Sequence, residues 1–337
     1  MIKKLSLLAL MLSTPLMAAT NYEIRMPTGA VSVASDTAES SSSTGGLIAG
    51  EANNTFLIVS GQTLKGMGGN VYGQMGPNGS GASTPNYEWV DTGLSDVVSV
   101  SSNSWTAALL SDGTAQAAGY NYCGQLGRTD NTSTTNPNPT WGDMGLTGVV
   151  SIKAGGGHAL ALMADGTLKG AGCNRYGSLA STLNNGSSVP NSTWADMGLS
   201  GVSQIEAAGN TSYALLSGGQ LMGVGYNRYG NLASTSNNMT SLAVPNWVDM
   251  GLSGVTQVAA SSNHTLALMS DGTVKAVGAN SNGQLAVVTN YGVTAANPSW
   301  VDMGLTGVSS ISAGAGWSAA LMNDGTVKGV GRNLYGN

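Results

Sequence analysis

The fold is decided by the stretch GVVSIKAGGGHALALMADGTLKGAGCNRYGSL, residues 148–179. Its segments 149–152 and 158–163 are short apolar runs bounded by glycine or polar residues, a pattern typical of β-strands. The dipeptide Asp165-Gly166 follows the second run and predicts a type I′ hairpin turn, in which both residues have positive φ. The residues after this turn should therefore run back antiparallel as a third strand.

A long polar loop separates this hairpin from the next apolar segment. The loop begins after Asn174, is rich in Asn and Ser, and ends near Trp194, where we expect a fourth strand. Residues with helical periodicity are absent from the whole unit. Four antiparallel strands in one unit predict a blade of a β-propeller.

The same unit recurs along the chain with a period of 53 residues. Asp-Gly or Gly-Gly pairs mark the turn at residues 112–113, 165–166, 218–219, 271–272 and 324–325. A tryptophan opens the pattern WxDMGL at Trp141, Trp194, Trp247 and Trp300, and Trp89 opens WVDTGL one unit earlier. Repeats near this length stack on one another to bury their apolar faces. We predict an all-β chain with about six repeats over residues 45–337, in which these tryptophans pack structurally.

Two strings resemble the repeat of the regulator of chromosome condensation family. They are HTLAL at residues 264–268 and DGTVKAVGANSNGQLA at residues 271–286, and GQLG returns at residues 124–127. The resemblance covers residues 47–337 and implies a propeller of the seven-bladed type, here in a secreted bacterial member. Its implication for function is broad, because that family includes nuclear exchange factors, photoreceptors, ubiquitin-ligase modules and a secreted β-lactamase inhibitor.

The sixth repeat ends at Asn337, before the tryptophan that it should contain, and two explanations remain open. The sequence could be truncated, which we favour. Alternatively, the N-terminal segment 20–44 could close a smaller ring by adding a strand, for which it offers Ile24, Met26, Val31 and Val33.

Small residues fill the third strand of every unit, as in Gly170-Ala171-Gly172. Glycine within a strand indicates that another backbone approaches closely. We therefore interpret the third strand as the one that lines the central axis. A structural role for these glycines is favoured over a phosphate-binding loop, because no helix follows them, as a dinucleotide site would require.

The first nineteen residues have the features of a secretory signal peptide. Lys3 and Lys4 precede a short apolar run, and Ala18-Ala19 offers a cleavage point. We expect an exported protein, secreted or periplasmic, with no membrane span in the mature chain. Without the two lysines the chain has 10 basic and 17 acidic residues, a formal charge of −7, which argues against a nucleic-acid partner.

Cys123 and Cys173 occupy different positions of the repeat, so we favour two free thiols over a disulfide between them. Together with the two histidines they lack the spacing of a zinc site. We therefore expect no metal and no cofactor.

Recognition should use the face that carries the long loops. The connection between strands one and two and the connection between strands three and four lie at the same end of a four-stranded meander. The first set of candidate side chains begins the second strand: Trp105, His158, His264 and Trp317, with Thr211 at the same position. The second set follows the third strand: Tyr72, Tyr122, Arg175, Tyr176, Arg228, Tyr229 and Tyr335. Aromatic residues and arginine dominate protein interfaces, although the tyrosines could equally pack between blades.

These features favour an exported, non-enzymatic scaffold that binds a protein or a surface glycan. A sharper alternative is an inhibitor of a secreted enzyme, as the family resemblance suggests. A propeller glycosidase or lyase ranks third, because no catalytic residues stand out from the repeat pattern and most aspartates are explained by turns.

Overall fold

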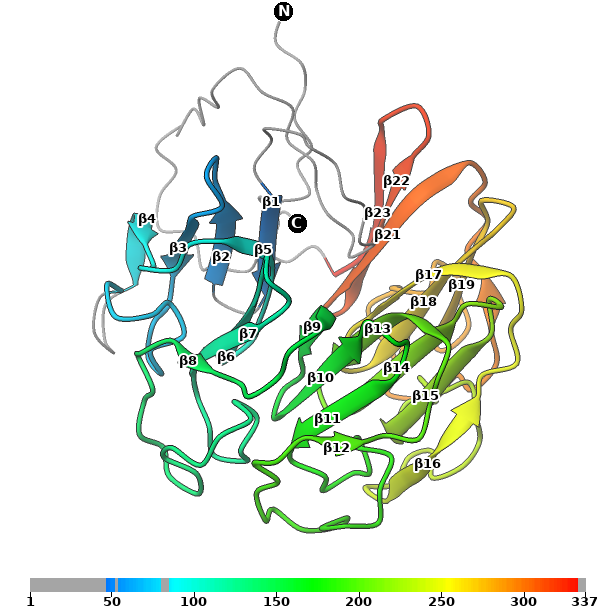
Figure 1. Ribbon diagram of the computed structural model, residues 1–337. Helices are drawn as coiled ribbons and strands as arrows, with labels where there is room; N and C mark the ends of the chain where they lie inside the picture. The colour runs from blue at the N-terminus through cyan, green and yellow to red at the C-terminus, as the bar shows by residue number, and fades with distance from the viewer. Residues whose placement is uncertain (1–46, 52–53, 80–84, 333–337) are drawn as a thin grey trace, which may run out of the picture.

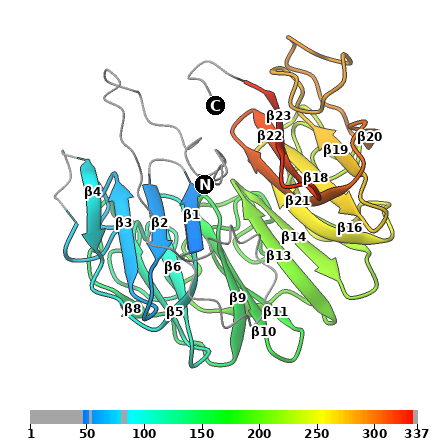
Figure 2. The ribbon, with the colours of Figure 1, turned by 90° about the horizontal axis from the view of Figure 1, so that it is seen from above.

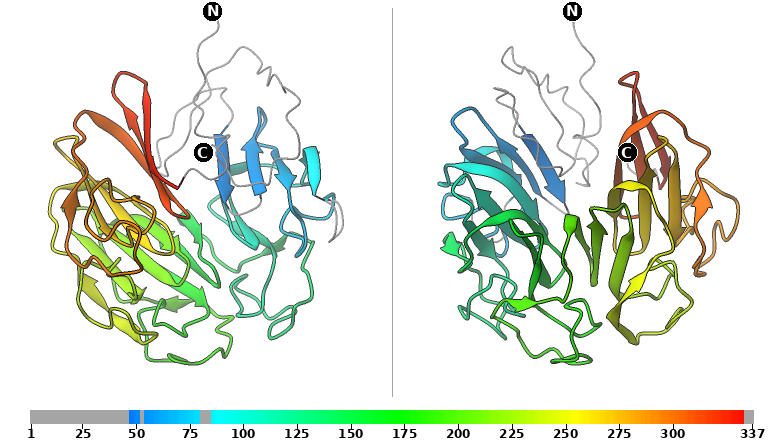
Figure 3. Two further views of the ribbon diagram at one scale, coloured as in Figure 1. Left: turned by 180° about the vertical axis from the view of Figure 1, so that it is seen from behind. Right: turned by 45° about the vertical axis from the view of Figure 1, so that its right-hand side comes forward.

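The computed structural model describes residues 47–51, 54–79 and 85–332. These residues form six antiparallel sheets arranged as blades around a common centre, five with four strands and the last with three (Figures 1 and 3). The prediction of an all-β propeller with about six repeats is confirmed. The described residues contain six blades rather than the seven that the family resemblance implies.

Each blade is a meander whose strands pair in chain order. Blade 1 contains β1 (Leu47–Glu51), β2 (Asn54–Ile58), β3 (Leu64–Gly68) and β4 (Asn86–Asp91). Blade 2 contains β5 (Val97–Ser102), β6 (Trp105–Leu110), β7 (Ala115–Gly119) and β8 (Gly142–Asp143). Blade 3 contains β9 (Val149–Ala154), β10 (His158–Met163), β11 (Leu168–Gly172) and β12 (Ala195–Asp196).

The later blades follow the same plan. Blade 4 contains β13 (Val202–Ala208), β14 (Thr211–Leu216), β15 (Leu221–Tyr226) and β16 (Ala243–Asp249). Blade 5 contains β17 (Val255–Ala260), β18 (His264–Met269), β19 (Val274–Gly278) and β20 (Val301–Asp302). Blade 6 contains β21 (Val308–Gly314), β22 (Trp317–Met322) and β23 (Val327–Gly331). The segment 20–44 and the signal-peptide prediction lie outside the described residues.

The first strand of each blade is the inner one, so the interpretation of the third strand as the inner strand was wrong. The first strands of neighbouring blades contact one another, and Figure 2 shows β1 and β13 nearer the centre than β4 and β16. Glycines in the middle of the third strand make room for side chains, whereas the last glycine lies close to the backbone at the start of the second strand, as expected: a Cβ added at Gly172 would lie 2.5 Å from Gly157 O. A Cβ added at Gly223 would lie 2.6 Å from Leu232 Cδ2 and 3.0 Å from Met250 Sδ.

The turn between the second and third strands also differs from the prediction. Gly166 has φ of 78°, but Asp165 is not among the residues with positive φ, so this is not a type I′ turn. Met163 N donates to Thr167 O and Gly166 N donates to Met163 O, each at 2.9 Å. This pattern is a three-residue hairpin loop, a type I turn followed by a left-handed glycine. Asp165 stabilises the loop as an acceptor for the Thr167 backbone N–H at 2.9 Å.

The recurrent tryptophans join each blade to the one before it. Four of them donate their indole N–H to a backbone carbonyl of the preceding blade: Trp141 to Thr92, Trp194 to Met144, Trp247 to Met197 and Trp300 to Met250. Each also packs, partly buried, against an interblade core cluster. The predicted structural role is confirmed for these four, whereas Trp89 is 37% exposed and does not share it.

Two glutamine side chains link neighbouring inner strands by hydrogen bonding to the backbone of the next blade's inner strand. Gln204 Nε2 donates to Val258 O at 3.1 Å, and Val258 N donates back to Gln204 Oε1 at 3.1 Å. Gln257 forms the same two bonds with Ile311. The side-chain amide thus satisfies backbone groups that would otherwise be left without partners at a buried strand edge.

Candidate interaction surface

The strand registers place both sets of candidate residues at one end of the blades. In blade 3, His158 at the start of β10 pairs with Gly172 at the end of β11, and Ala159 pairs with Ala154 at the end of β9. The long loop after the third strand therefore shares a face with the turn between the first and second strands. We call this the long-loop face; the Asp-Gly turns lie on the opposite face.

The first candidate set is mostly interior, so its proposed role as an exposed row was wrong. Trp105 and His264 are completely buried and His158 is 1% exposed, whereas Trp317 of blade 6 is half-buried. Trp105 Nε1 donates to Gly155 O of blade 3 at 2.9 Å. The position is buried because the next blade packs over the start of the second strand.

The two histidines make hydrogen bonds to the following blade. Ser212 Oγ donates to Ser178 O at 2.7 Å, so the 2.9 Å contact between Ser212 Oγ and His158 Nε2 requires the histidine to donate. His264 donates in the same way to Ser318. Burial lowers the pKa of each histidine to about 4, which keeps both neutral at pH 7.

The second candidate set gathers at the junctions between blades. The Tyr72 and Tyr120 rings lie 4.8 Å apart between blades 1 and 2, and Tyr122 stacks on Tyr120 at 6.2 Å. The Tyr176 and Tyr226 rings lie 4.7 Å apart between blades 3 and 4. Each pair joins the end of one blade's third strand to the loop of the preceding blade.

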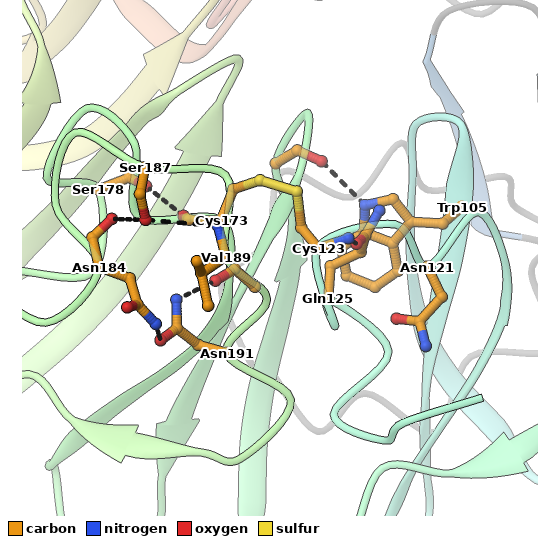
Figure 4. The surroundings of a disulfide bond; sticks show 12 residues. Trp105, Asn121, Cys123, Gln125, Cys173, Ser178, Asn184, Ser187, Val189 and Asn191 are labelled. Carbon is orange, nitrogen blue, oxygen red and sulfur yellow. Dashed lines mark hydrogen bonds between the residues drawn. A yellow bond between two sulfur atoms is a disulfide. The ribbon is translucent and has the colours of Figure 1, made fainter. Parts of the chain in front are cut away.

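At the equivalent junction between blades 2 and 3, two cysteines take the place of the tyrosines. They form a disulfide (Figure 4). The Cα atoms of Cys123 and Cys173 are 4.9 Å apart, so the preference for two free thiols was wrong. That preference rested on their different repeat positions. Neighbouring blades bring those two different positions together, as the Tyr176–Tyr226 contact shows one blade later.

Two arginines complete the second set. The guanidinium carbon of Arg175 lies 5.7 Å from the ring centre of Tyr176, and that of Arg228 lies 6.0 Å from the ring centre of Tyr229. Both distances are within the range of cation–π attraction. Arg175 is exposed, whereas Arg228 and both tyrosines are half-buried.

These junction residues form one surface feature, which we call the aromatic arc. It consists of Tyr72, Tyr120, Tyr122, Arg175, Tyr176, Tyr226, Arg228 and Tyr229. Tyr120 and Tyr226 were not among the candidates named from the sequence. Each contacts a named candidate of the preceding blade, Tyr72 and Tyr176 respectively. Burial and the neighbouring tyrosines raise the pKa of Tyr120. Tyr335 lies outside the described residues.

The long loops of blades 3 to 5 add exposed apolar side chains beside the arc. The exposed members are Leu183, Val189, Met239, Leu242, Val288, Tyr291 and Val293. Val189 lies near the disulfide in Figure 4. The corresponding loop of blade 2 contains Asn and Thr in place of these residues.

Other kinds of site are not apparent in the described part of the chain. No three His, Cys, Asp or Glu side chains come together there to hold a metal ion. Lys153 and Glu206, on the inner strands of blades 3 and 4, form an ion pair at 3.0 Å. Among the same residues, no helix has the length and apolar character needed to cross a membrane.

Comparison with known proteins agrees with this architecture. The model of the regulator of chromosome condensation (RCC1) repeat matches residues 149–178 and 255–284. The Arabidopsis thaliana ultraviolet-B receptor UVR8 is 28% identical over 184 residues, which are 54% of this chain but only 41% of the receptor. This chain therefore spans less than half the length of that receptor.

Solved structures extend the similarity to most of the chain. Human WBSCR16 is 26% identical with a TM-score of 0.71, covering 84% of this chain and 76% of that one. Saccharomyces cerevisiae Prp20p is 19% identical with a TM-score of 0.70, covering 84% and 71%. Yeast RCC1 (Prp20) has also been solved bound to Kap60, and binding of Prp20p to Gsp1p and histones is described for that protein. The chain thus has the RCC1-like propeller fold.

Proposed function

We propose that this RCC1-like propeller is an exported, non-enzymatic recognition scaffold that binds a protein partner through the aromatic arc. The proposal rests mainly on one observation: two clusters of tyrosines and arginines, one joining blades 1 and 2 and one joining blades 3 and 4, lie on the long-loop face and remain partly exposed. These residue types supply most of the energy at protein interfaces.

The scaffold around the arc supports a binding role. Ring contacts between blades hold Tyr72, Tyr120, Tyr176 and Tyr226, so these side chains lose less conformational entropy when a partner docks. The apolar loop residues Leu183, Leu242 and Val288 extend the same face and would add buried area. Exposed apolar groups that are grouped on one face are typical of interaction sites.

Export is part of the proposal, and the disulfide supports it. Disulfides persist in oxidising compartments and are rare in the cytosol. Cys123 and Cys173 are paired in the structure, in agreement with the signal-peptide features of residues 1–19.

A capture experiment with matched variants tests the proposal. The mature protein would be immobilised and exposed to the secreted and envelope proteins of the source culture, beside a Tyr122→Ala/Tyr229→Ala variant and an Asn323→Ala variant. Asn323 is exposed on the opposite face. Both variants should melt within a few degrees of the wild type, because none of the three side chains is fully buried.

We expect a partner that is retained by the wild type and by Asn323→Ala. The tyrosine variant should bind it at least about thirtyfold more weakly, on the hot-spot scale of about 2 kcal/mol. Equal retention by all three proteins would place recognition elsewhere and refute the role of the arc.

Inhibition of a secreted enzyme remains a specific form of this function. Trp105 is buried and is not available as an anchor for it, but the tyrosines of the arc are. An enzyme activity assay on any captured partner, with and without this protein, would distinguish inhibition from simple binding.

A further inference from the structure

Two guanidinium groups belong to a single aromatic cluster within the arc. Arg175 lies over Tyr176, and the Tyr176 ring contacts the Tyr226 ring of the next blade at 4.7 Å. Arg228 interacts with Tyr226 and lies over Tyr229. Because these contacts are continuous, both positive charges lie on one patch that crosses the junction of blades 3 and 4.

No carboxylate neutralises this patch within the described part of the chain. Neither Arg175 nor Arg228 forms an ion pair there, and the Nε of Arg228 is buried without a hydrogen-bond acceptor. The long loops at residues 173–194, 227–242 and 279–300 contain no Asp or Glu.

Most acidic residues of blades 2 to 6 lie at the opposite end of the blades. Four sit in the turns between second and third strands: Asp112, Asp165, Asp271 and Asp324. Four more are the last residues of the fourth strands: Asp143, Asp196, Asp249 and Asp302. On the long loops of blades 2 to 5 the only acid is Asp130, and it pairs with Arg128 at 2.9 Å. The molecule is therefore negative overall but carries unpaired positive charge on its long-loop face.

The chemistry of the patch selects the ligand. A guanidinium that lies over a tyrosine ring can still direct N–H donors at a ligand, and their fork geometry matches the two oxygens of a carboxylate.

We propose that the patch formed by Arg175, Tyr176, Tyr226 and Arg228 binds the carboxylate side chains of an acidic segment in the partner protein. This inference rests on the proposed function and specifies the chemistry of the partner. The flanking tyrosines contact the apolar parts of that segment, while the two arginines fix its register across the blade junction.

Fluorescence anisotropy with a defined probe tests the inference. The probe is a fluorescein-labelled peptide of alternating Glu and Gly, and the same peptide with Gln in place of Glu is the neutral comparison. Binding is measured at low salt and at about 1 M salt, where the screening length falls to about 3 Å. The proteins are the wild type, the Arg175→Gln/Arg228→Gln variant and a Lys169→Gln/Lys275→Gln variant.

The lysine variant is the matched control, since it loses the same net charge from the third strands rather than from the arc. We expect the wild type and the lysine variant to bind the Glu peptide equally at low salt. The arginine variant should bind it at least about tenfold more weakly, as expected for loss of charge-assisted hydrogen bonds. Thermal melts of all three should agree within a few degrees.

Several results would overturn the inference. They are equal binding of the Glu and Gln peptides, no binding of the Glu peptide by the wild type, equal weakening by both double variants, and binding of a sulfated polysaccharide but not of the peptide. Loss of partner capture in Tyr122→Ala/Tyr229→Ala together with any of these results would leave the proposed function standing and reject only the acidic segment.

Discussion

Cys123 and Cys173 are joined across the junction of blades 2 and 3 at the position where Tyr176 and Tyr226 meet across the next junction. In both cases the contacting residues are 50 apart in the chain. The loop of the following blade secures the disulfide junction further, because Asn191 N donates to Cys123 O at 3.1 Å. The disulfide thus takes the place of the ring-to-ring contact that Tyr176 and Tyr226 make at the next junction.

Removal of the disulfide should destabilise the protein. For a sequence separation of 50 residues the chain-entropy model gives about 4 kcal/mol for a Cys123→Ser/Cys173→Ser variant. Denaturant unfolding with and without reductant measures this loss. A Cys123→Tyr/Cys173→Tyr variant, which copies the neighbouring junction, should recover part of it. Two free thiols in mass spectra of the oxidised wild type would contradict the pairing.

Acid should weaken the junctions that contain His158 and His264. Their pKa is about 4 in the folded protein and near 6.5 when unfolded, so the unfolded chain binds more protons between these values. Stability is therefore complete above about pH 6.5 and falls as the pH drops towards 4, by about 3 kcal/mol for each histidine. Denaturant unfolding from pH 7 to pH 4 measures the slope.

A His158→Gln/His264→Gln variant serves as the comparison for this slope. It should lose most of the pH dependence between 6.5 and 4, whatever its stability at pH 7. The turn aspartates do not account for the effect, because hydrogen bonds from Thr114 and Thr167 lower the pKa of Asp112 and Asp165 below 3.8. If the variant kept the wild-type slope, the histidines would not be its source.

Truncation of Trp105 should lower the free energy of unfolding. It should not remove a direct contact with the partner. Trp105→Ala removes a fully buried indole and its hydrogen bond to Gly155, and we expect a loss of about 3–5 kcal/mol. Trp89→Ala is the comparison, since Trp89 is 37% exposed and should cost about 1 kcal/mol or less. Similar midpoints for the two variants in denaturant would refute the assigned packing.

Replacement of the glycine in the middle of the third strand should cost different amounts of stability in different blades. Gly223→Ala would place a methyl group 2.6 Å from the buried Leu232 and should cost about 1–3 kcal/mol. Gly329→Ala of blade 6 meets only Ser318 O at 3.8 Å and should change stability by no more than about 0.5 kcal/mol. Thermal or denaturant melts of the two variants test this directly, and equal losses would argue against the packing described for Gly223.

The repeat made the blades predictable from the sequence because a blade is built from local pairings. The segment 158–163 was predicted as a strand and is β10 with the same bounds, and the return strand and fourth strand follow where expected. The shared end of the first-to-second and third-to-fourth connections also follows from meander topology alone. The turn type did not follow, because Asp-Gly suits a type I turn with a left-handed glycine as well as a type I′ turn.

Contacts between blades were decided only by the tertiary structure. Trp105 and Trp317 share one repeat position, yet Trp105 is fully buried and Trp317 is half-buried. The exposure of this position depends on the residues of the neighbouring blade that pack against it. The aromatic arc and the disulfide pair positions that are offset from the 53-residue step, so alignment of the repeats with themselves separates residues that the ring brings together. By itself the sequence determined the unit and its strands; the rotation from one blade to the next determined which side chains meet, which are buried and which remain available to a partner.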